Sequence, residues 1–344
     1  MRDLPLGEYR PRSELVVAET PLERSRLPVT DAHNHAALWW ETGRPVEDLL
    51  RLMDELGIER MVNISGFCGD DWLSSYRGFE ERYPRRFATI GLLDLAGLGG
   101  PGFEERLRRE MRRMKEAGLH GFKAWKDLGL RLRDTAGRLV MPDDERLAPV
   151  WNCAAELGLP VFLHLADPVA FFKPLDATNE RYEELRAHPD WHFFGPEFPG
   201  FDELLAAQER LLAREKGTSF ILAHVAGYAE NLAYVSGLLD RLPHVHIDLS
   251  ARFGELGRQP RAAREFILRH ADRILYGLDG MADPIHYRLT FRLLETLDEY
   301  FPYAPGDPPP QGRWRVYGLG LPDDVLAKIY RENARRLIPG LCNE

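Results

Sequence analysis

Hydrophobic residues along this chain gather in short runs that alternate with longer segments of amphipathic pattern. Eight such runs are rich in Val, Ile, Leu or Phe, and most are bounded by Gly, Pro or polar residues, which is typical of buried strands. The predicted strands are Pro28–His33, Arg60–Ser65, Phe87–Asp94, Gly121–Lys126, Pro160–Leu165, Ser219–Val225, Val245–Ser250 and Arg273–Asp279.

The segments between these runs carry apolar residues at helical spacing. The predicted helices include Val46–Leu56, Phe103–Ala117, Asp144–Leu157, Phe201–Glu215, Ala262–His270 and Ile285–Tyr300. Gly57, Gly118 and Gly158 directly follow three of these helices. Glycine is a typical helix end because it adopts the left-handed backbone conformation without a steric penalty.

Eight strand–helix alternations predict an α/β fold whose parallel strands are covered by helices, and eight such strands close into a TIM (β/α)8 barrel. A doubly wound open sheet is the rival fold. It usually has fewer strands, and no glycine-rich phosphate-binding motif follows the first predicted strand. We therefore predict one barrel domain over residues 29–344, preceded by a polar, proline-punctuated N-terminal arm over residues 1–28 that packs outside the barrel or reaches a neighbouring subunit.

Two connections are longer than a compact barrel needs. Residues 166–200 follow the fifth predicted strand and are rich in aromatic side chains, and residues 302–321 are rich in Pro and Gly. Structureless connections of this length usually serve as lids or binding loops. We expect a long loop insertion after the fifth strand, with aromatic side chains that either line a pocket or form a local core.

Composition narrows the class of protein. Of 344 residues, 45 are Lys or Arg and 54 are Asp or Glu, and the resulting net charge of −9 argues against a nucleic-acid-binding protein. Three widely spaced cysteines, Cys68, Cys153 and Cys342, argue against a disulfide framework or a cysteine zinc site. No run approaches the ~20 apolar residues of a membrane helix, and no signal-peptide pattern begins the chain. We expect a cytoplasmic protein with no membrane partner.

Metal-competent side chains stand at the ends of four predicted strands. His33 and His35 follow the first strand at a spacing that places both imidazoles on one face. His164, His224 and Asp279 end the fifth, sixth and eighth strands. Since the active site of a (β/α)8 barrel lies at the C-terminal ends of its strands, these five side chains are predicted to converge on one mouth and to form a metal site.

Successive side chains of a strand point to opposite faces of the sheet, so residues two apart in the sequence face the same way. The pairs expected to share a face are Phe162 with His164, Leu222 with His224, and Gly277 with Asp279. In the seventh strand His246, Asp248 and Ser250 share a face. If this face points inward, Asp248 either orients a metal-bound imidazole or belongs to a polar layer with no metal role, and Asp31 is a similar candidate.

Six segments, taken together, carry a family resemblance. They are Asp31-Ala32-His33-Asn34-His35, Gly121-Phe122-Lys123, Val161-Phe162-Leu163-His164, Ala223-His224-Val225-Ala226-Gly227, Gly277-Leu278-Asp279 and Asn333-Ala334-Arg335-Arg336-Leu337. As a set they resemble the amidohydrolase superfamily, specifically its amidohydrolase-related branch, from about residue 29 to the end of the chain. That branch contains metal-dependent hydrolases, lactonases and non-oxidative decarboxylases, so the resemblance implies the scaffold more firmly than the substrate.

The resemblance implies that His33, His35, His164 and Asp279 hold one divalent metal ion, with Zn²⁺ the first candidate and Mn²⁺ the second. Asp279 would accept a proton from a metal-activated water and pass it to the leaving group. His224 would act beside the metal as an acid, a base or a polarising group, or else as a fifth ligand.

The same resemblance allows two roles for Lys123, as a metal-bridging residue or as one that binds no metal. In binuclear members a lysine of the fourth strand is carboxylated and bridges two metals, whereas the mononuclear branch carries a lysine in this motif that does not bridge. We favour a mononuclear site in which Lys123 contacts the substrate or balances charges inside the barrel.

Further residues are candidates for substrate binding. Arg252 and Arg258 follow the seventh strand, and a guanidinium at the mouth suits a carboxylate substrate. Trp39, just after the histidine pair, and His192, in the long loop, are additional candidate contacts, and His192 is not expected to bind metal.

The predicted function is metal-dependent hydrolysis of a small-molecule ester, lactone or amide. The alternative is non-oxidative decarboxylation of a hydroxylated aromatic or unsaturated carboxylic acid at the same metal site. The expected partner is the small-molecule substrate. Whether this substrate is a carboxylate, and whether the protein is a homodimer, are left open.

Overall fold

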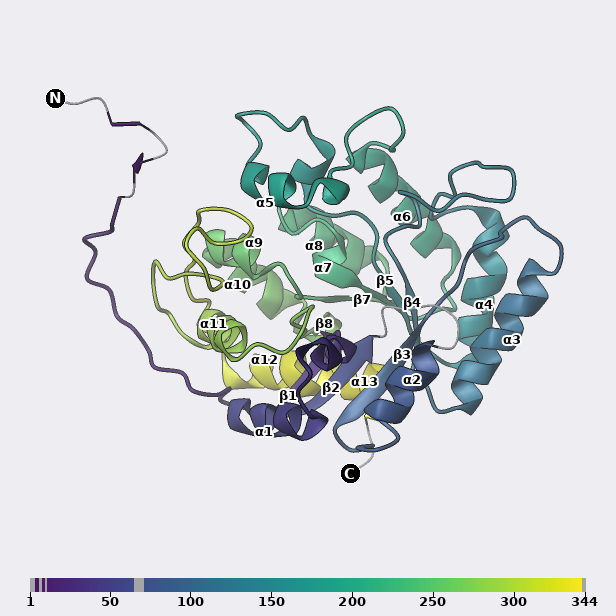
Figure 1. Cartoon of the computed structure of the whole chain (residues 1–344), viewed down its shortest axis with the longest axis horizontal. Helices are drawn as coiled ribbons and strands as arrows, with labels where there is room; N and C mark the ends of the chain where they lie inside the picture. Colours follow the sequence, from purple (N-terminus) through teal and green to yellow (C-terminus); the bar gives the residue numbers. More distant parts are fainter. Residues whose placement is uncertain (1–3, 6–7, 10, 65–70, 342–344) are drawn as a thin grey trace.

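Eight parallel strands form one sheet in which each strand pairs with the next along the chain (Figure 1). The structure is a computed structural model that describes residues 4–5, 8–9, 11–64 and 71–341. The strands are β1 (Val29–Asn34), β2 (Ile58–Ile64), β3 (Phe87–Leu92), β4 (Phe122–Ala124), β5 (Val161–Leu163), β6 (Phe220–Leu222), β7 (Val245–Asp248) and β8 (Ile274–Leu275). Backbone hydrogen bonds from Ala32 N to Tyr276 O and from Asp279 N to His33 O join β1 to the residues that follow β8. The predicted TIM (β/α)8 barrel is confirmed.

Helices surround this ring of strands (Figure 1). They are α1 (Val46–Leu56), α2 (Asp71–Gly78), α3 (Phe103–Glu116), α4 (Ala148–Leu157), α5 (Tyr182–Ala187), α6 (Phe201–Arg214), α7 (Ala223–Ala226), α8 (Leu232–Arg241), α9 (Phe253–Arg258), α10 (Pro260–Arg269), α11 (Pro284–Glu295), α12 (Asp323–Ala327) and α13 (Asn333–Leu337). A single π-helical turn, Lys328–Glu332, joins the last two. No helix among the described residues is long and apolar enough to cross a membrane.

Helix α1 shows why these sequences form these elements. Its apolar residues Val46, Leu49, Met53 and Leu56 recur at helical spacing and are all buried, and each such side chain contributes about 1.5–3 kcal/mol through burial. The helix ends at Gly57, whose φ of 80° is left-handed. The predicted and observed bounds of this helix coincide.

Helix α11 is shorter than its predicted range. The pattern predicts a helix as far as Tyr300, but α11 ends at Glu295 because the backbone of Thr296 is extended. The hydroxyl of Thr296 donates to the carbonyl oxygen of Arg292, which satisfies one acceptor of the last turn. The prediction of this boundary was therefore wrong by five residues.

The inside of the barrel is a packed apolar core. It is built from inward side chains of the strands and from residues near the C-terminus: Ala32, Val62, Ile64, Ala88, Ile90, Phe162, Ile221, Leu275, Ala334, Ile338 and Leu341. A larger cluster fills the layer between the strands and the helices. At the C-terminal ends of the strands the inward positions become polar, with His33, Lys123 and Asp248 all buried. This change of side-chain character places the candidate site.

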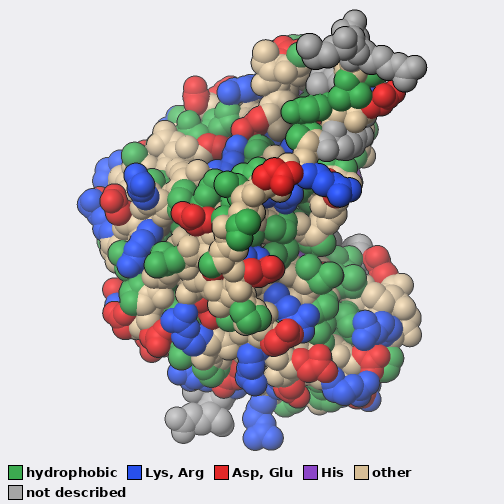
Figure 2. Space-filling view, turned by 90° about the vertical axis from the view of Figure 1, so that its left-hand side faces the viewer, with side chains coloured by type: hydrophobic (Ala, Val, Ile, Leu, Met, Phe, Trp, Pro, Cys, Tyr) green, Lys and Arg blue, Asp and Glu red, His purple; other side chains and the backbone are tan. Residues whose placement is uncertain are grey.

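The stretch before β1 runs over the outside of the barrel and then away from it (Figure 1). Thr20 donates from both its backbone nitrogen and its hydroxyl to the carboxylate of Asp298, at 2.7 Å each. Nearer the barrel, the backbone nitrogen of Arg26 donates to the carboxylate of Glu295. Figure 2 views the side from which this stretch leaves and shows acidic and basic side chains interspersed over it. The division of the chain into an arm and one barrel domain stays a prediction.

The long connection between β5 and α6 contains two 3-10 turns, Val169–Phe172 and Pro189–Trp191, on either side of α5. Most of its aromatic residues pack on one another and on α6, as a local core that includes Phe172, Phe193 and Leu185. Phe171 and Trp191 also line a pocket at the barrel mouth. Some of these aromatic residues therefore form a local core, and others line a pocket, so each of the two predicted roles is filled.

Candidate metal centre

An irregularity in β1 turns its histidines inward. Asp31 pairs with Met61 and Asn34 with Asn63, so that Ala32 and His33 together stand opposite Val62. Because a bulge of this kind shifts the alternation, Ala32 and His33 can both face the barrel interior. Accordingly, Ala32 belongs to the inner core, while Nδ1 of His33 lies 2.7 Å from a carboxylate oxygen of Asp248 on β7.

A left-handed turn brings His224 to the same place. Leu222 packs in the outer core and Ile221 in the inner one, so regular alternation would direct His224 outward. Instead the backbone of His224 has φ 61° and ψ 47°, and its ring centroid lies 5.1 Å from that of His33. The expectation that Leu222 and His224 share a face was wrong, because α7 is not a continuation of the strand.

Close approach of β8 to β1 positions the last candidate ligand. A Cβ atom added at Gly277 would lie 2.6 Å from the Cβ of His33, so only glycine permits this spacing. Two residues later, Asp279 adopts a left-handed backbone with φ 63°. Its carboxylate lies 3.0 Å from Nε2 of His35, 3.5 Å from Nε2 of His33 and 3.7 Å from Nε2 of His224.

The other ring nitrogen of each of these histidines is bound by the protein. Nδ1 of His33 donates to Asp248, Nδ1 of His35 to the carbonyl oxygen of Ile64 at 2.9 Å, and Nδ1 of His224 to the carbonyl oxygen of Ser250 at 3.0 Å. A carbonyl oxygen only accepts, so Nδ1 carries the proton and Nε2 of a neutral ring presents a lone pair. Metal-binding histidines are oriented in this way.

The resulting arrangement fits a divalent cation. Three nitrogen lone pairs face one carboxylate, and such acceptors repel each other unless a positive charge lies between them. The ammonium group of Lys123, 3.4 Å from Nε2 of His33, offsets part of this repulsion. His33, His35 and Asp279 form a group whose ligand atoms all lie within 4.8 Å of one another. Imidazole nitrogen with carboxylate oxygen is a donor set that Zn²⁺ and Mn²⁺ accept.

His164 lies beside this group but outside it. Its ring centroid is 4.3 Å from that of His224, whereas its Nε2 lies 3.4 Å from a carboxylate oxygen of Asp167. This buried Nε2 atom has no hydrogen-bond partner among the described residues. Burial lowers the pKa of His164 to about 4, so the ring is neutral at physiological pH, as a metal ligand must be.

Burial and neighbouring charges set the protonation of the rest of the cluster. Burial and the Lys123 ammonium lower the pKa of His33, and burial lowers the pKa of His224 still further. Although burial acts in the opposite direction, the histidines, once protonated at lower pH, hold the pKa of Asp279 well below its usual range. Burial lowers the pKa of Lys123 to about 8 against the opposing effect of Asp248. The centre therefore combines neutral imidazoles with ionised carboxylates.

A pocket of about 520 Å³ opens above this cluster. His164, His224 and Asp279 form part of its floor, and Trp125, Phe171, Trp191, Phe253 and Tyr303 supply aromatic surface. Four cationic side chains, Lys126, Arg131, Arg181 and Arg252, also line it. Arg252 is almost fully buried, and one of its guanidinium nitrogens lies 3.7 Å from Asp167. Aromatic walls with a few convergent charges are typical of small-molecule sites.

A family model described as amidohydrolase matches residues 31–340. The chain belongs to the amidohydrolase family. This match confirms the resemblance seen in the sequence, and it spans every residue of the centre described above. No curated protein sequence matches the chain.

Solved structures share the fold of this amidohydrolase at low sequence identity. The 2,6-dihydroxybenzoate decarboxylase from Rhizobium is 18% identical, with a TM-score of 0.57 over 90% of this chain and 98% of that one. A dihydroxybenzoic acid decarboxylase from a Polaromonas species, with bound manganese and the inhibitor 2-nitroresorcinol, is 16% identical, with a TM-score of 0.57 over 91% and 97%. The 4-oxalomesaconate hydratase from Rhodopseudomonas palustris is 13% identical, with a TM-score of 0.52 over 91% and 96%.

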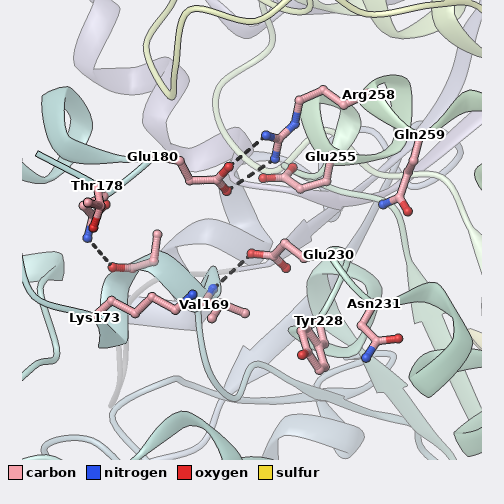
Figure 3. A pocket seen from close by; sticks show the side chains of 12 residues that line it. Val169, Lys173, Thr178, Glu180, Tyr228, Glu230, Asn231, Glu255, Arg258 and Gln259 are labelled. Carbon is pink, nitrogen blue, oxygen red and sulfur yellow. Dashed lines mark hydrogen bonds and ion pairs between the residues drawn. The ribbon is translucent and has the colours of Figure 1, made fainter.

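Three candidate substrate contacts of the amidohydrolase lie elsewhere. Arg258 lines a different pocket, of about 620 Å³, where it pairs with Glu180 at 2.9 Å (Figure 3). Trp39 is buried in the outer core and donates from its indole nitrogen to the carbonyl oxygen of Pro45. His192 is bound through Nε2 to the carbonyl oxygen of Lys173. None of these three is among the residues that line the pocket above the metal centre.

Several pocket residues were not predicted from the sequence. Trp125 directly follows the Lys123 motif, and its ring packs edge-on against those of His35 and His164. Asp167, three residues after His164, accepts from Lys126 at 2.9 Å. Position after a strand end could have indicated both. His286 comes from α11, far from any strand end, and the sequence carries no signal for it. Cys68 and Cys342 lie outside the described residues, and Cys153 is buried in α4.

Proposed function

We propose that this amidohydrolase is a metal-dependent hydrolase of a small ester, lactone or amide that bears a carboxylate group. The observation that supports this most strongly is the convergence of three imidazole nitrogens on the carboxylate of Asp279, beneath a pocket that contains the buried Arg252. The convergence supports the metal, and Arg252 supports the charge of the substrate.

The metal would be held by His33, His35 and Asp279, with His164 as the fourth ligand. The orphaned Nε2 of His164 supports its inclusion, since a buried nitrogen without a partner is costly. We propose Zn²⁺ as the first choice and Mn²⁺ as the second. A cation held there would supply Lewis-acid polarisation of a substrate oxygen.

The protein's own residues would carry the proton and hold the substrate. Asp279, ionised and partly exposed at the pocket floor, would accept a proton from the attacking water and pass it to the leaving oxygen or nitrogen. His224 presents the lone pair of Nε2 toward the same carboxylate, so it suits a proton acceptor or a ligand better than a hydrogen-bond donor. Arg252 would pair with the substrate carboxylate, and Trp125 would pack against its apolar part.

A second function is supported by a different observation. The aromatic side chains of the pocket suit a planar aromatic acid, and two of the similar structures are dihydroxybenzoate decarboxylases. In that reaction the same cluster would hold the carboxylate and a neighbouring hydroxyl of a hydroxylated aromatic acid, and a side chain would protonate the ring carbon that loses carbon dioxide.

One experiment separates the two functions. Zinc-loaded and manganese-loaded protein is incubated with carboxylate-bearing lactones and esters, with their neutral methyl-ester counterparts, and with hydroxylated benzoic acids. We expect hydrolysis of the carboxylate-bearing substrates, with the neutral counterparts much poorer and Asp279→Asn inactive. Release of carbon dioxide from a benzoic acid, without hydrolysis of any ester or lactone, would refute the first proposal and establish the second.

A further inference from the structure

A pocket of about 620 Å³ is rich in carboxylates and shares no lining residue with the pocket above the metal centre (Figure 3). Glu180, Glu230 and Glu255 line it, together with two cationic side chains, Lys173 and Arg258. Arg258 is bound to Glu180 at 2.9 Å, and the side chain of Lys173 is exposed. Neither cation forms an ion pair with Glu230 or Glu255 in the described part of the chain. These two carboxylates are therefore left without a cation from the pocket's own lining.

Glu255 of α9 has a buried oxygen without a partner. The residue is 1% exposed, and one of its carboxylate oxygens accepts from Nη2 of Arg181. Nη1 of the same arginine is bound to Glu184 at 2.7 Å, so that one guanidinium serves two carboxylates. The other oxygen of Glu255 has no hydrogen-bond partner among the described residues. Because a buried carboxylate oxygen without a partner is costly, this oxygen indicates that a donor from outside the chain binds there.

Glu230, in the connection between α7 and α8, shows the same feature. One of its oxygens accepts from the backbone nitrogen of Val169 at 3.0 Å, and the other is buried and has no partner among the described residues. Burial raises the pKa of Glu230, and the negative charge of Glu255 raises it further. Figure 3 shows the two carboxylates turned toward the same part of the pocket. A cation bound there would relieve the repulsion between them and give both free oxygens a partner.

The pocket suits an organic cation better than a metal ion. Among the described residues, every group of three His, Cys, Asp or Glu ligand atoms within 4.8 Å of one another includes His33 and lies at the metal centre. The carboxylates of Glu180, Glu230 and Glu255 therefore do not form a compact metal-binding group. The volume of the pocket instead lies in the range of about 300–1,000 Å³ that is typical of small-molecule sites.

Neutral side chains complete the pocket. Tyr228 supplies an aromatic ring, which can pack against an apolar group or attract a cation to its face. The amide nitrogen of Gln259 donates to the carbonyl oxygen of Ala229 at 2.7 Å, so the amide oxygen is the atom that can accept from a ligand. The side-chain oxygen of Asn231 accepts from the backbone nitrogen of Tyr234 at 3.1 Å, so its amide nitrogen can donate to one. A ligand with a cationic end and a small apolar or polar body matches this lining.

We propose that this pocket binds a small primary amine, whose ammonium group lies between the carboxylates of Glu230 and Glu255 and whose body lies over Tyr228. A primary ammonium group has three N–H donors and no acceptor, so it can donate to both unpartnered oxygens at once. Hydrogen bonds between an ammonium group and a carboxylate are stronger than those between neutral groups. The site does not depend on the catalytic function proposed above, because its lining is separate from that of the metal centre.

The test is isothermal titration calorimetry of the full chain with n-butylamine and with phenethylamine. Their neutral counterparts, n-butanol and phenethyl alcohol, have nearly the same shape and carry no charge. We expect one molecule of either amine to bind per chain with a dissociation constant of about 1 mM or lower, and neither alcohol to bind. Mg²⁺ and Ca²⁺ are titrated separately and should not bind in this pocket.

Glu230→Gln locates the site. Glutamine keeps the oxygen that accepts from Val169 and replaces the unpartnered oxygen by a donor, so the amines should bind about 10- to 100-fold more weakly. Glu255 is less suitable for replacement, because it also holds Arg181, which lines the pocket above the metal centre. Glu209→Gln on α6 is the matched control, and Asp279→Asn removes the same charge from the metal centre. Both should keep the wild-type affinity for amines.

The thermal midpoint separates a binding role of Glu230 from a structural one. The amines should raise the midpoint of the wild type and leave that of Glu230→Gln unchanged. Without ligand, Glu230→Gln should unfold no lower than the wild type, because it loses a buried charge that no residue pairs.

Four results would overturn the proposal. They are the absence of saturable amine binding by the wild type, equal affinity of an amine and its alcohol, unchanged amine affinity in Glu230→Gln, and loss of amine binding in Asp279→Asn, which would place the amine at the metal centre. Binding of Mg²⁺ or Ca²⁺ that is lost in Glu230→Gln would identify a metal site instead. The comparison of amines with alcohols uses the wild type alone, so it can refute the proposal whether or not a variant folds.

Discussion

Replacing Asp248 by asparagine should weaken the metal centre without removing a ligand. Asp248 is fully buried on β7, and its two oxygens have separate partners. One oxygen accepts from Nδ1 of His33 at 2.7 Å, and the other accepts from the backbone nitrogens of His224 at 2.9 Å and Ser250 at 3.1 Å. In asparagine one oxygen becomes an amide group that donates. If it replaces the oxygen beside His33, two donors meet and the ring must shift its proton to Nε2, the nitrogen that would bind the metal.

The expected loss of metal affinity can be judged from the known contribution of residues that hydrogen-bond to metal-binding histidines. Groups that orient metal-bound histidines typically contribute 10- to 100-fold to metal affinity. Because Asp248 fixes the tautomer of His33 and also anchors the turn that carries His224, we expect a loss near the upper end, about 100-fold or ~2.7 kcal/mol.

The assay is competition for Zn²⁺ between the protein and a fluorescent chelator. Asp272→Asn, which alters an exposed carboxylate paired with Lys328, provides the control and should keep wild-type affinity. Circular dichroism and thermal unfolding confirm that both variants are folded at the assay temperature. Wild-type zinc affinity in folded Asp248→Asn would show that the histidine cluster is not the metal site, and the reasoning from ring tautomers would fail with it.

Three further outcomes follow from the same structure. Arg252→Met should raise KM for a carboxylate substrate about 10- to 100-fold, since a charge-assisted hydrogen bond contributes about 1.5–3 kcal/mol, whereas Arg258→Met should leave steady-state kinetics unchanged. Trp39→Ala should lower the free energy of unfolding, measured in urea, by about 3–5 kcal/mol, and an intact zinc affinity would confirm that Trp39 is structural. Burial, with Arg273 and Arg336, lowers the pKa of His246 to about 3, while the unfolded chain takes up this proton near 6.5. The stabilisation by neutral His246 is therefore complete above pH 6.5 and is lost as the pH falls toward 3. Wild type should lose about 2 kcal/mol more stability than His246→Gln between about pH 7 and pH 5, and equal losses in urea titrations would contradict this.

The sequence predicted the barrel because the information for each strand and helix is local. In α1 the apolar spacing, the proline before it and the glycine after it all indicate the same helix. The extent of β8 is not local. Only Ile274 and Leu275 remain in the strand, because Tyr276 donates its backbone N–H to the carbonyl oxygen of Ile329, a residue from the C-terminal segment. The pattern of apolar residues around β8 does not indicate that a residue so distant in the sequence will bind there.

Some features of the candidate site could likewise be predicted from the sequence, and others could not. That His33, His35 and Asp279 meet could be expected, since each stands at a strand end. The bulge in β1 and the left-handed turn at His224 could not, because both alter alternation without a mark in the pattern of apolar residues. Trp39 shows the converse error. It is close in sequence to His35, but the 3-10 turn Ala36–Thr42 carries its ring into the outer core.

Backbone strain in this barrel is concentrated at one end. Apart from Tyr300, every non-glycine residue with positive φ in the described chain lies within four residues after β5, β6, β7 or β8: Ala166, His224, Val225, Ala226, Ala251 and Asp279. Each left-handed residue of this kind costs about 1–3 kcal/mol, and such conformations persist only where the surrounding structure enforces them. Here the packed core beneath the mouth enforces them, and what they achieve is to direct His224 and Asp279 toward His33. A barrel selected for stability alone would avoid these conformations. Their clustering therefore supports the proposal that the C-terminal mouth is the functional end of the molecule, without reference to any related protein.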